Sequence, residues 1–112
     1  YYPNRAKDCF EKYLERYPSD LQARIQYASI LITLSNYEDA EKELELSKYL
    51  LSKKSVYKAD NYKVRKTKHE LLYNTLRLYA YQNKANKAEA DAEALKQYKK
   101  YLQNPHRYVT TI

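Results

Sequence analysis

Basic side chains crowd one short stretch of this 112-residue chain. Residues 52–68 contain a single acidic residue, Asp60, and two tyrosines, Tyr57 and Tyr62. The seven basic residues of this segment are Lys53, Lys54, Lys58, Lys63, Arg65, Lys66 and Lys68. Cations pair with phosphates and aromatic rings stack on bases, so the pattern fits RNA, and it fits an acidic protein segment equally well. The segment therefore predicts RNA or an acidic protein as partner, or else a solvated helix face in a lysine-rich chain.

Side chains that could carry catalysis or hold a metal ion are scarce. His69 and His106 are the two histidines, and neither has a nucleophile or a second ligand at motif spacing. The single cysteine, Cys9, excludes an internal disulfide and the four-cysteine zinc sites, and next to Phe10 we expect an inert, packed thiol. The chain has no glycine, which argues against a phosphate-binding loop or a dinucleotide fingerprint. We therefore expect no enzymatic activity, no metal and no cofactor.

Charge is unevenly divided along the chain. Residues 1–50 contain seven basic and nine acidic residues, whereas residues 51–112 contain fourteen basic and five acidic residues. The net charge of +7 therefore comes from the second part of the chain. An anionic partner would be attracted to that part rather than to the first.

Tyrosine is over-represented, with fifteen copies in the chain. Tyr13, Tyr27 and Tyr79 fall on helix faces that we expect to form core. Many of the others are hard to bury together in so small a domain, and exposed aromatic residues are enriched at interfaces. These other tyrosines are Tyr17, Tyr37, Tyr49, Tyr57, Tyr62, Tyr98 and Tyr101. The excess indicates either an interaction surface or the codon bias of an A/T-rich genome.

Helices are the elements that must position these residues. Apolar side chains recur at helical spacing along residues 6–17, and this amphipathic stripe consists of Ala6, Phe10, Tyr13 and Leu14. Pro18 should end the helix, because proline disfavours helical geometry in the preceding residue. Ser19 with Gln22 forms a capping box for the next helix, and Asp20 is a competing cap. We expect an all-α fold.

Hydrophobic residues make up 44% of the chain, but they form no long apolar run and no signal peptide. We therefore expect an intracellular protein, cytoplasmic or nuclear, that does not enter a membrane.

The helical pattern repeats after 34 residues. The matched pairs are Ala6 and Ala40, Phe10 and Leu44, Tyr13 and Ser47, and Pro18 and Ser52. Helical hairpins with a 34-residue period are typical of tetratricopeptide repeats, and the chain resembles this family. Residues 21–54 match a full repeat at Tyr27, Ala28, Leu31, Ala40 and Leu44, and residues 1–18 match a second helix. The chain departs from the family pattern at three positions, Arg24 for an aromatic residue, Ala28 for glycine and Ser52 for proline.

The resemblance implies antiparallel hairpins stacked as a short solenoid of about five helices, which serves as a scaffold for a partner protein. In this family, the first helices of the repeats form a concave face that holds a peptide. Carried onto this chain, that face consists of Gln22, Ile25, Gln26, Ser29, Ile32 and Thr33. The chain also resembles the half-tetratricopeptide repeats of RNA-processing factors, at Arg5-Ala6, Glu11, Tyr13-Leu14, Pro18 and Tyr27-Ala28. That alternative implies binding of RNA or an acidic partner through residues 53–68.

The predicted helical domain spans residues 1–104. Residues 1–18 form the second helix of a truncated repeat, residues 19–52 a full repeat, and residues 53–104 a degenerate repeat or a capping hairpin. Within this last part we expect a helix over residues 60–82 capped by Asp60, a turn at 83–86 and a return helix over 87–103. Residues 105–112 should form an extended tail.

The predicted first helix lacks the partner helix that would complete its hairpin. We therefore expect the chain to be a piece of a longer array, and part of the first helix's apolar stripe to remain uncovered. An uncovered stripe of this kind favours self-association.

Overall fold

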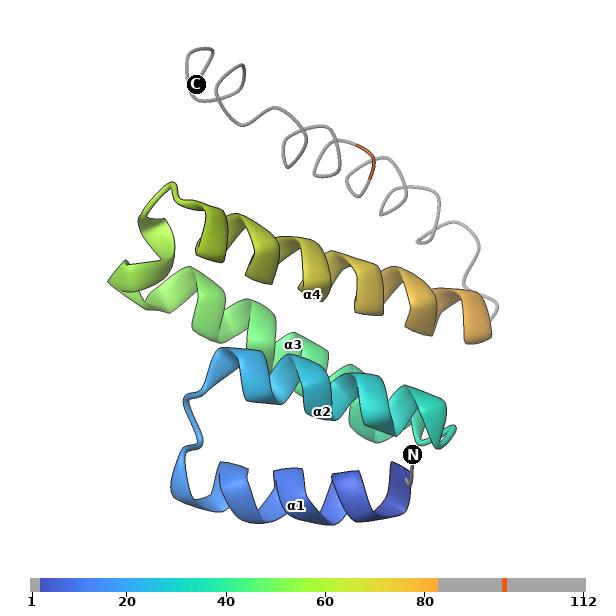
Figure 1. Cartoon of the computed structure of the whole chain (residues 1–112). Helices are drawn as coiled ribbons and strands as arrows, with labels where there is room; N and C mark the ends of the chain where they lie inside the picture. Colours follow the sequence, from blue (N-terminus) through green and yellow to red (C-terminus); the bar gives the residue numbers. More distant parts are fainter. Residues whose placement is uncertain (1–2, 83–95, 97–112) are drawn as a thin grey trace. The chain divides into compact units, whose positions relative to one another are not determined.

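The computed structural model describes residues 3–82 and residue 96. This part of the chain contains the helices α1 (Pro3–Arg16), α2 (Leu21–Thr33), α3 (Tyr37–Lys53) and α4 (Tyr62–Tyr81), and a short 3-10 helix, η1 (Ser55–Lys58), with no strand among the described residues (Figure 1). The predicted all-α class is confirmed. The expected turn at 83–86, the return helix at 87–103 and the tail at 105–112 lie outside the described residues.

The chain forms two compact units, Tyr1–Lys53 and Lys54–Ile112. In the first unit, α2 packs against both α1 and α3, and the three helices run in alternating directions (Figure 1). The central helix supplies most of the core, since Leu21, Ile25, Ala28, Leu31 and Ile32 are all buried. Two helices approach closely where side chains are short, and Ala28 is fully buried, as is Ala40 of α3.

The turn between α1 and α2 follows from its proline and its cap. Helix α1 ends at Arg16, before Pro18, as predicted. The Asp20 side chain accepts a hydrogen bond of 3.2 Å from the Ala23 amide and caps α2. Of the two candidate caps, Asp20 is therefore the N-cap residue of α2.

The turn between α2 and α3 has a geometry that usually requires glycine. Ser35 adopts a positive φ of 63°. Its amide donates to the Ile32 carbonyl (3.0 Å), and the Asn36 amide donates to the Leu31 carbonyl (2.8 Å). These two hydrogen bonds form a Schellman motif, which provides donors for carbonyl groups in the last turn of α2. In a chain without glycine, serine takes the left-handed position at some cost in backbone strain.

Arg24 links the α1–α2 turn to α3. Its Nε donates to the Pro18 carbonyl at 2.7 Å, and its guanidinium pairs with the Glu43 carboxylate at 2.7 Å. Both members of the ion pair are largely buried, with 13% and 19% of their side chains exposed. One side chain of α2 thus contacts both the α1–α2 turn and α3.

The second unit contains η1 and α4 among its described residues. The predicted cap of α4 was wrong by one position, because Asn61 accepts from the Val64 amide at 2.9 Å. Asp60 instead pairs with Arg65 at 3.0 Å. On the buried face of α4, two threonine hydroxyls donate to backbone carbonyls of the same helix. Thr67 donates to the Lys63 carbonyl and Thr75 to the Leu71 carbonyl. These bonds satisfy polar groups that would otherwise be costly to bury.

Candidate interaction site

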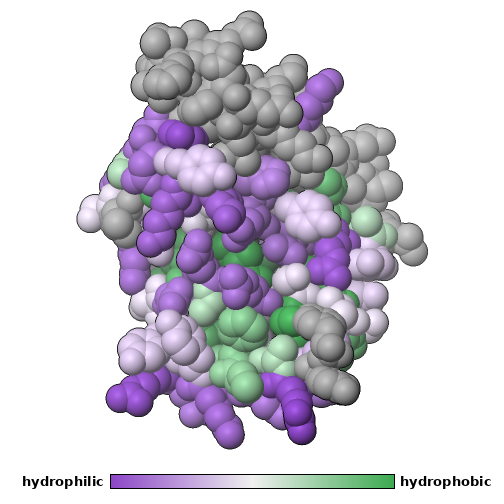
Figure 2. Space-filling view, viewed as in Figure 1, coloured by the Kyte–Doolittle hydropathy of each residue, from purple (hydrophilic) through white to green (hydrophobic). Residues whose placement is uncertain are grey.

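An open hollow of about 560 Å³ lies between α1 and α2 in the first unit. Hydrophobic residues are visible in this part of the surface in Figure 2. The hollow is lined by Ala6, Cys9, Phe10 and Tyr13 of α1, Asp20 of the turn, and Gln22, Ala23 and Gln26 of α2. It is therefore a groove with an apolar wall on one helix and a largely polar wall on the other.

The wall contributed by α1 is the stripe that the sequence predicted as apolar. Only Leu14 of that stripe is buried, while Ala6 and Phe10 are partly exposed. Two expectations were wrong here. Tyr13 is 42% exposed rather than part of the core, and Cys9 is exposed rather than packed. Both side chains line the hollow because this side of α1 is only partly covered.

The wall contributed by α2 contains part of the predicted peptide-binding face. Ile25 and Ile32 are buried in the core, so they are not accessible to a partner. The remaining four residues are partly or fully exposed, and all four carry polar side chains: Gln22, Gln26, Ser29 and Thr33. The structure brings Gln22 and Gln26 to the hollow together with α1. Spaced three or four residues apart, the four lie along one side of α2.

The turn end of the hollow is fixed by Tyr13 and Asp20. The Tyr13 hydroxyl donates to the Asp20 carboxylate at 2.6 Å. This hydrogen bond, with burial and the negative charge of Asp20 adding to it, raises the pKa of Tyr13. The ring of Tyr13 lies 4.9 Å from that of Tyr17, and the Arg16 guanidinium lies 5.9 Å from the Tyr17 ring. Asp20 thus caps α2 and also fixes the position of Tyr13, which belongs to the α1 wall of the hollow.

The predicted basic segment is divided between the two units. Lys53 ends α3 in the first unit, where its ammonium lies 5.7 Å from the Tyr49 ring. Arg65 is buried and pairs with Asp60, so it contributes structure rather than an open charge. The other members belong to the second unit and are exposed or partly exposed: Lys54, Lys58, Lys63, Lys66 and Lys68. The contiguous patch expected from the sequence is therefore reduced to these five lysines.

Metal-ligating side chains form no cluster in the described part of the chain. Over residues 3–82 and 96, no three His, Cys, Asp or Glu side chains form a group that could hold a metal ion. His69 lies on α4, and His106 lies outside the described residues. Among the helices of the same residues, none combines the length and apolar character needed to cross a membrane.

Comparison with known proteins adds no relative: no protein-family model, curated protein or solved structure matches this chain. The candidate site therefore depends on the chain's own geometry.

Sequence reasoning predicted part of each wall but did not combine the two walls into one site, because it assigned Gln22 and Gln26 to a peptide groove and the uncovered α1 stripe to self-association. Gln22 and Gln26 were among the predicted groove residues, whereas Cys9, Asp20 and Ala23 were not. The available signal was the unpaired first helix, since an apolar stripe without a covering helix should leave a depression beside its neighbour.

Proposed function

We propose that this protein is an interaction module built from helical hairpins, and that it binds a segment of another protein in the hollow between α1 and α2. The single observation that carries the proposal is the open hollow itself. Its volume of about 560 Å³ lies within the range typical of binding pockets in proteins. An apolar wall with a few polar groups is also the usual composition of such a site.

The two walls offer complementary contacts to a peptide. Phe10 and Ala6, both partly exposed, supply apolar surface for an anchoring side chain. The amides of Gln22 and Gln26 each combine donors with an acceptor, so they can bond the backbone of a bound segment. Apolar contacts of this kind persist at high salt, in contrast to contacts with phosphates.

The architecture that we propose around this hollow is a short solenoid of the tetratricopeptide type. Support comes from the 34-residue period and from the alternating directions of α1, α2 and α3. The return helix predicted over residues 87–103 would bring the total to about five helices. In this proposal the protein is a scaffold rather than an enzyme.

Site-specific cross-linking from Cys9 tests the proposal, because Cys9 is the single cysteine and lines the hollow. A benzophenone maleimide attached to Cys9 is photoactivated in a nuclease-treated extract of the cells that make the protein. Cross-linked partners are identified by mass spectrometry. A matched probe attached through Ser52→Cys in a Cys9→Ser background, on the exposed end of α3, should not capture them.

Affinity for the captured partner is then measured with two matched variants of α1. Cys9→Trp should fill the hollow and weaken binding at least about tenfold, in low and in high salt. Lys12→Trp introduces the same ring at an exposed position outside the hollow and should leave the affinity unchanged. Equal affinity of both variants, or binding that disappears at high salt, would contradict the proposed function.

A further inference from the structure

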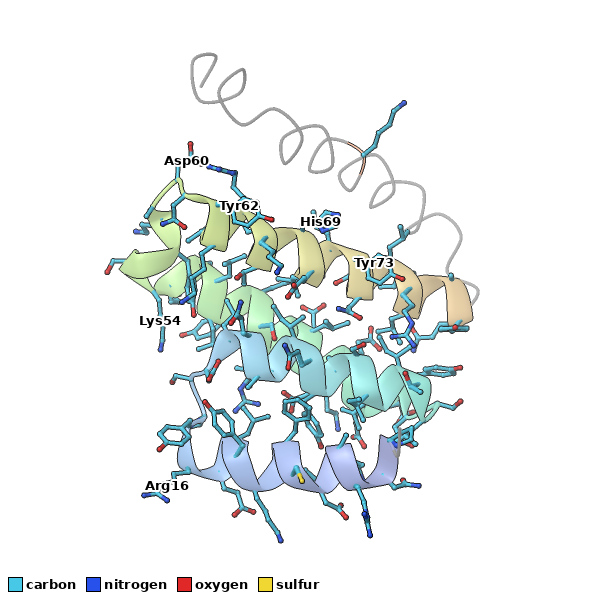
Figure 3. All side chains as sticks on the ribbon, in the orientation of Figure 1. Arg16, Lys54, Asp60, Tyr62, His69 and Tyr73 are labelled. Atoms are coloured by element: carbon cyan, nitrogen blue, oxygen red, sulfur yellow. The ribbon has the colours of Figure 1, made fainter. Side chains whose placement is uncertain are left out.

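Two tyrosines on α4 present unusually open rings. Tyr62 is 60% exposed and Tyr73 is 52% exposed. Figure 3 labels both of them along α4, with His69 between them. Positions 62, 69 and 73 lie on one side of a helix, because seven and eleven residues correspond to about two and three turns. The two rings are therefore about 16 Å apart along the helix axis.

Three other exposed tyrosines have a cation close to the ring. Arg16 lies 5.9 Å from the Tyr17 ring, Lys53 lies 5.7 Å from the Tyr49 ring and Arg77 lies 5.8 Å from the Tyr81 ring. Within the described part of the chain, the rings of Tyr62 and Tyr73 have no such cation or aromatic contact. Their faces are thus available to a flat partner group.

Positive charge accompanies the two rings. Lys66 falls between them on the same side of the helix, Lys63 lies next to Tyr62, and both lysines are exposed. The acidic groups of this region are few. Asp60 pairs with Arg65 at 3.0 Å, and Glu70 is the single carboxylate on α4. The exposed side of α4 therefore alternates aromatic and basic groups.

We propose that this side of α4 binds single-stranded nucleic acid, with bases stacked on Tyr62 and Tyr73 and phosphates paired with Lys63 and Lys66. Strands without sequence preference are bound by this combination of stacking rings and a positive track. An acidic peptide would pair with the lysines but would place no flat group on the two tyrosine rings. A duplex would offer phosphates but no free base faces. A single strand uses both kinds of group.

Fluorescence anisotropy with the full chain tests this proposal. The probes are fluorescein-labelled twelve-nucleotide oligouridine and oligothymidine, a duplex of the same length, and a twelve-residue glutamate peptide. The single strands should bind most tightly. Tyr62→Ala combined with Tyr73→Ala should weaken that binding at least about tenfold, since each stacked base contributes substantially. The matched control, Tyr17→Ala combined with Tyr49→Ala, removes two exposed tyrosines of the first unit and should change the affinity less than about twofold.

A salt series separates stacking from phosphate contact. Lys63→Gln combined with Lys66→Gln should reduce the slope of log K against log salt by about 1.4, at roughly 0.7 per phosphate contact on a single strand. The tyrosine variant should lose affinity with an unchanged slope. Glu70→Gln should strengthen binding, because it removes the neighbouring negative charge.

Tighter binding of oligouridine, tighter binding of oligothymidine, or equal binding of the two supports the proposal. Binding of the duplex or the glutamate peptide as tightly as oligouridine would overturn it, as would full affinity in the tyrosine variant. If that variant loses its helical circular dichroism, the lysine variant still decides the matter, and an unchanged salt slope would count against the proposal.

Discussion

Helices α1 and α3 have matched sequences and different surroundings. Ala40, Leu44 and Ser47 of α3 are 0–2% exposed, whereas their counterparts 34 residues earlier are partly or well exposed. These counterparts are Ala6, Phe10 and Tyr13, and all three line the hollow. Both helices pack on α2, so the difference lies in how fully this face is covered. A repeat in sequence specifies a helix with an apolar stripe, but not the element that completes its burial.

The polar contacts that connect the two helices to their neighbours also differ in burial, and those of α3 are the more buried. Helix α3 is tied to α2 by the largely buried Arg24–Glu43 pair. Helix α1 is tied to the turn before α2 by an exposed hydrogen bond from Tyr13 to Asp20. Since exposed polar contacts are partly replaced by water when broken, α3 should be the more firmly held helix.

The largest expected effect comes from truncating the matched apolar residues. Leu44→Ala should lower the free energy of unfolding by about 2–4 kcal/mol, because it opens a cavity at a fully buried site. Phe10→Ala should cost clearly less, although phenylalanine is larger, because Phe10 is already partly exposed. Urea unfolding followed by circular dichroism measures both, and equal losses would remove the distinction between the helices.

Enlarging the matched alanines sharpens the same comparison. Ala40→Leu should cost about 1–3 kcal/mol through overpacking at a site with no exposed surface. Ala6→Leu should be close to neutral, because its side chain can extend into the hollow. Thermal melts of the two variants provide the test. A destabilised Ala6→Leu would mean that the α1 face is packed as tightly as the α3 face.

Removing the polar links should produce a smaller difference. Arg24→Met should cost about 1–2 kcal/mol, because the Glu43 carboxylate loses its charged donor in a largely buried setting. The lost hydrogen bond to the Pro18 carbonyl is exposed and should add little. Tyr13→Phe should cost less, since water can replace its hydroxyl at Asp20. Chemical denaturation of the two variants, with m-values compared, measures the effect. A greater loss in Tyr13→Phe would contradict the ranking of the links.

The smallest expected effect is a gain in stability at the α2–α3 turn. Ser35→Gly should stabilise the protein by about 0.5–1 kcal/mol, because glycine adopts a positive φ without the clash that serine accepts. The α1–α2 turn offers a matched control, since Ser19→Gly replaces a residue without positive φ and should be neutral or destabilising. Differential scanning calorimetry would register the opposite signs, and a destabilised Ser35→Gly would show that serine carries no strain there.

The sequence predicted the helices well and their surroundings less well. Pro18, the 34-residue period and the apolar stripes located α1, α2 and α3, because these features act within one turn or one helix. The cap of α4 was displaced from Asp60 to Asn61, a choice between adjacent residues that depends on local geometry. Exposure of Cys9 and Tyr13 depends on which helix lies opposite them. A periodic pattern contains no information on that point.

The predicted binding residues illustrate the same limit. Ile25 and Ile32 share a helix with Gln22 and Gln26, yet the isoleucines face the core and the glutamines face the hollow. In the basic segment, Arg65 is buried and pairs with Asp60, and the linear order of residues did not indicate either fact. Residue type located the candidates, and packing decided which of them a partner can reach.

Thiol reactivity at matched positions tests most directly the claim that α1 is open where α3 is covered. Tyr13→Cys and Ser47→Cys are compared in a Cys9→Ser background, and alkylation by iodoacetamide is followed by mass spectrometry. The thiol of Tyr13→Cys should react nearly as fast as in the urea-unfolded chain. The thiol of Ser47→Cys replaces a residue with no exposed surface, and it should react at least about a hundredfold more slowly, because it requires local unfolding. Equal rates at the two positions would contradict the account.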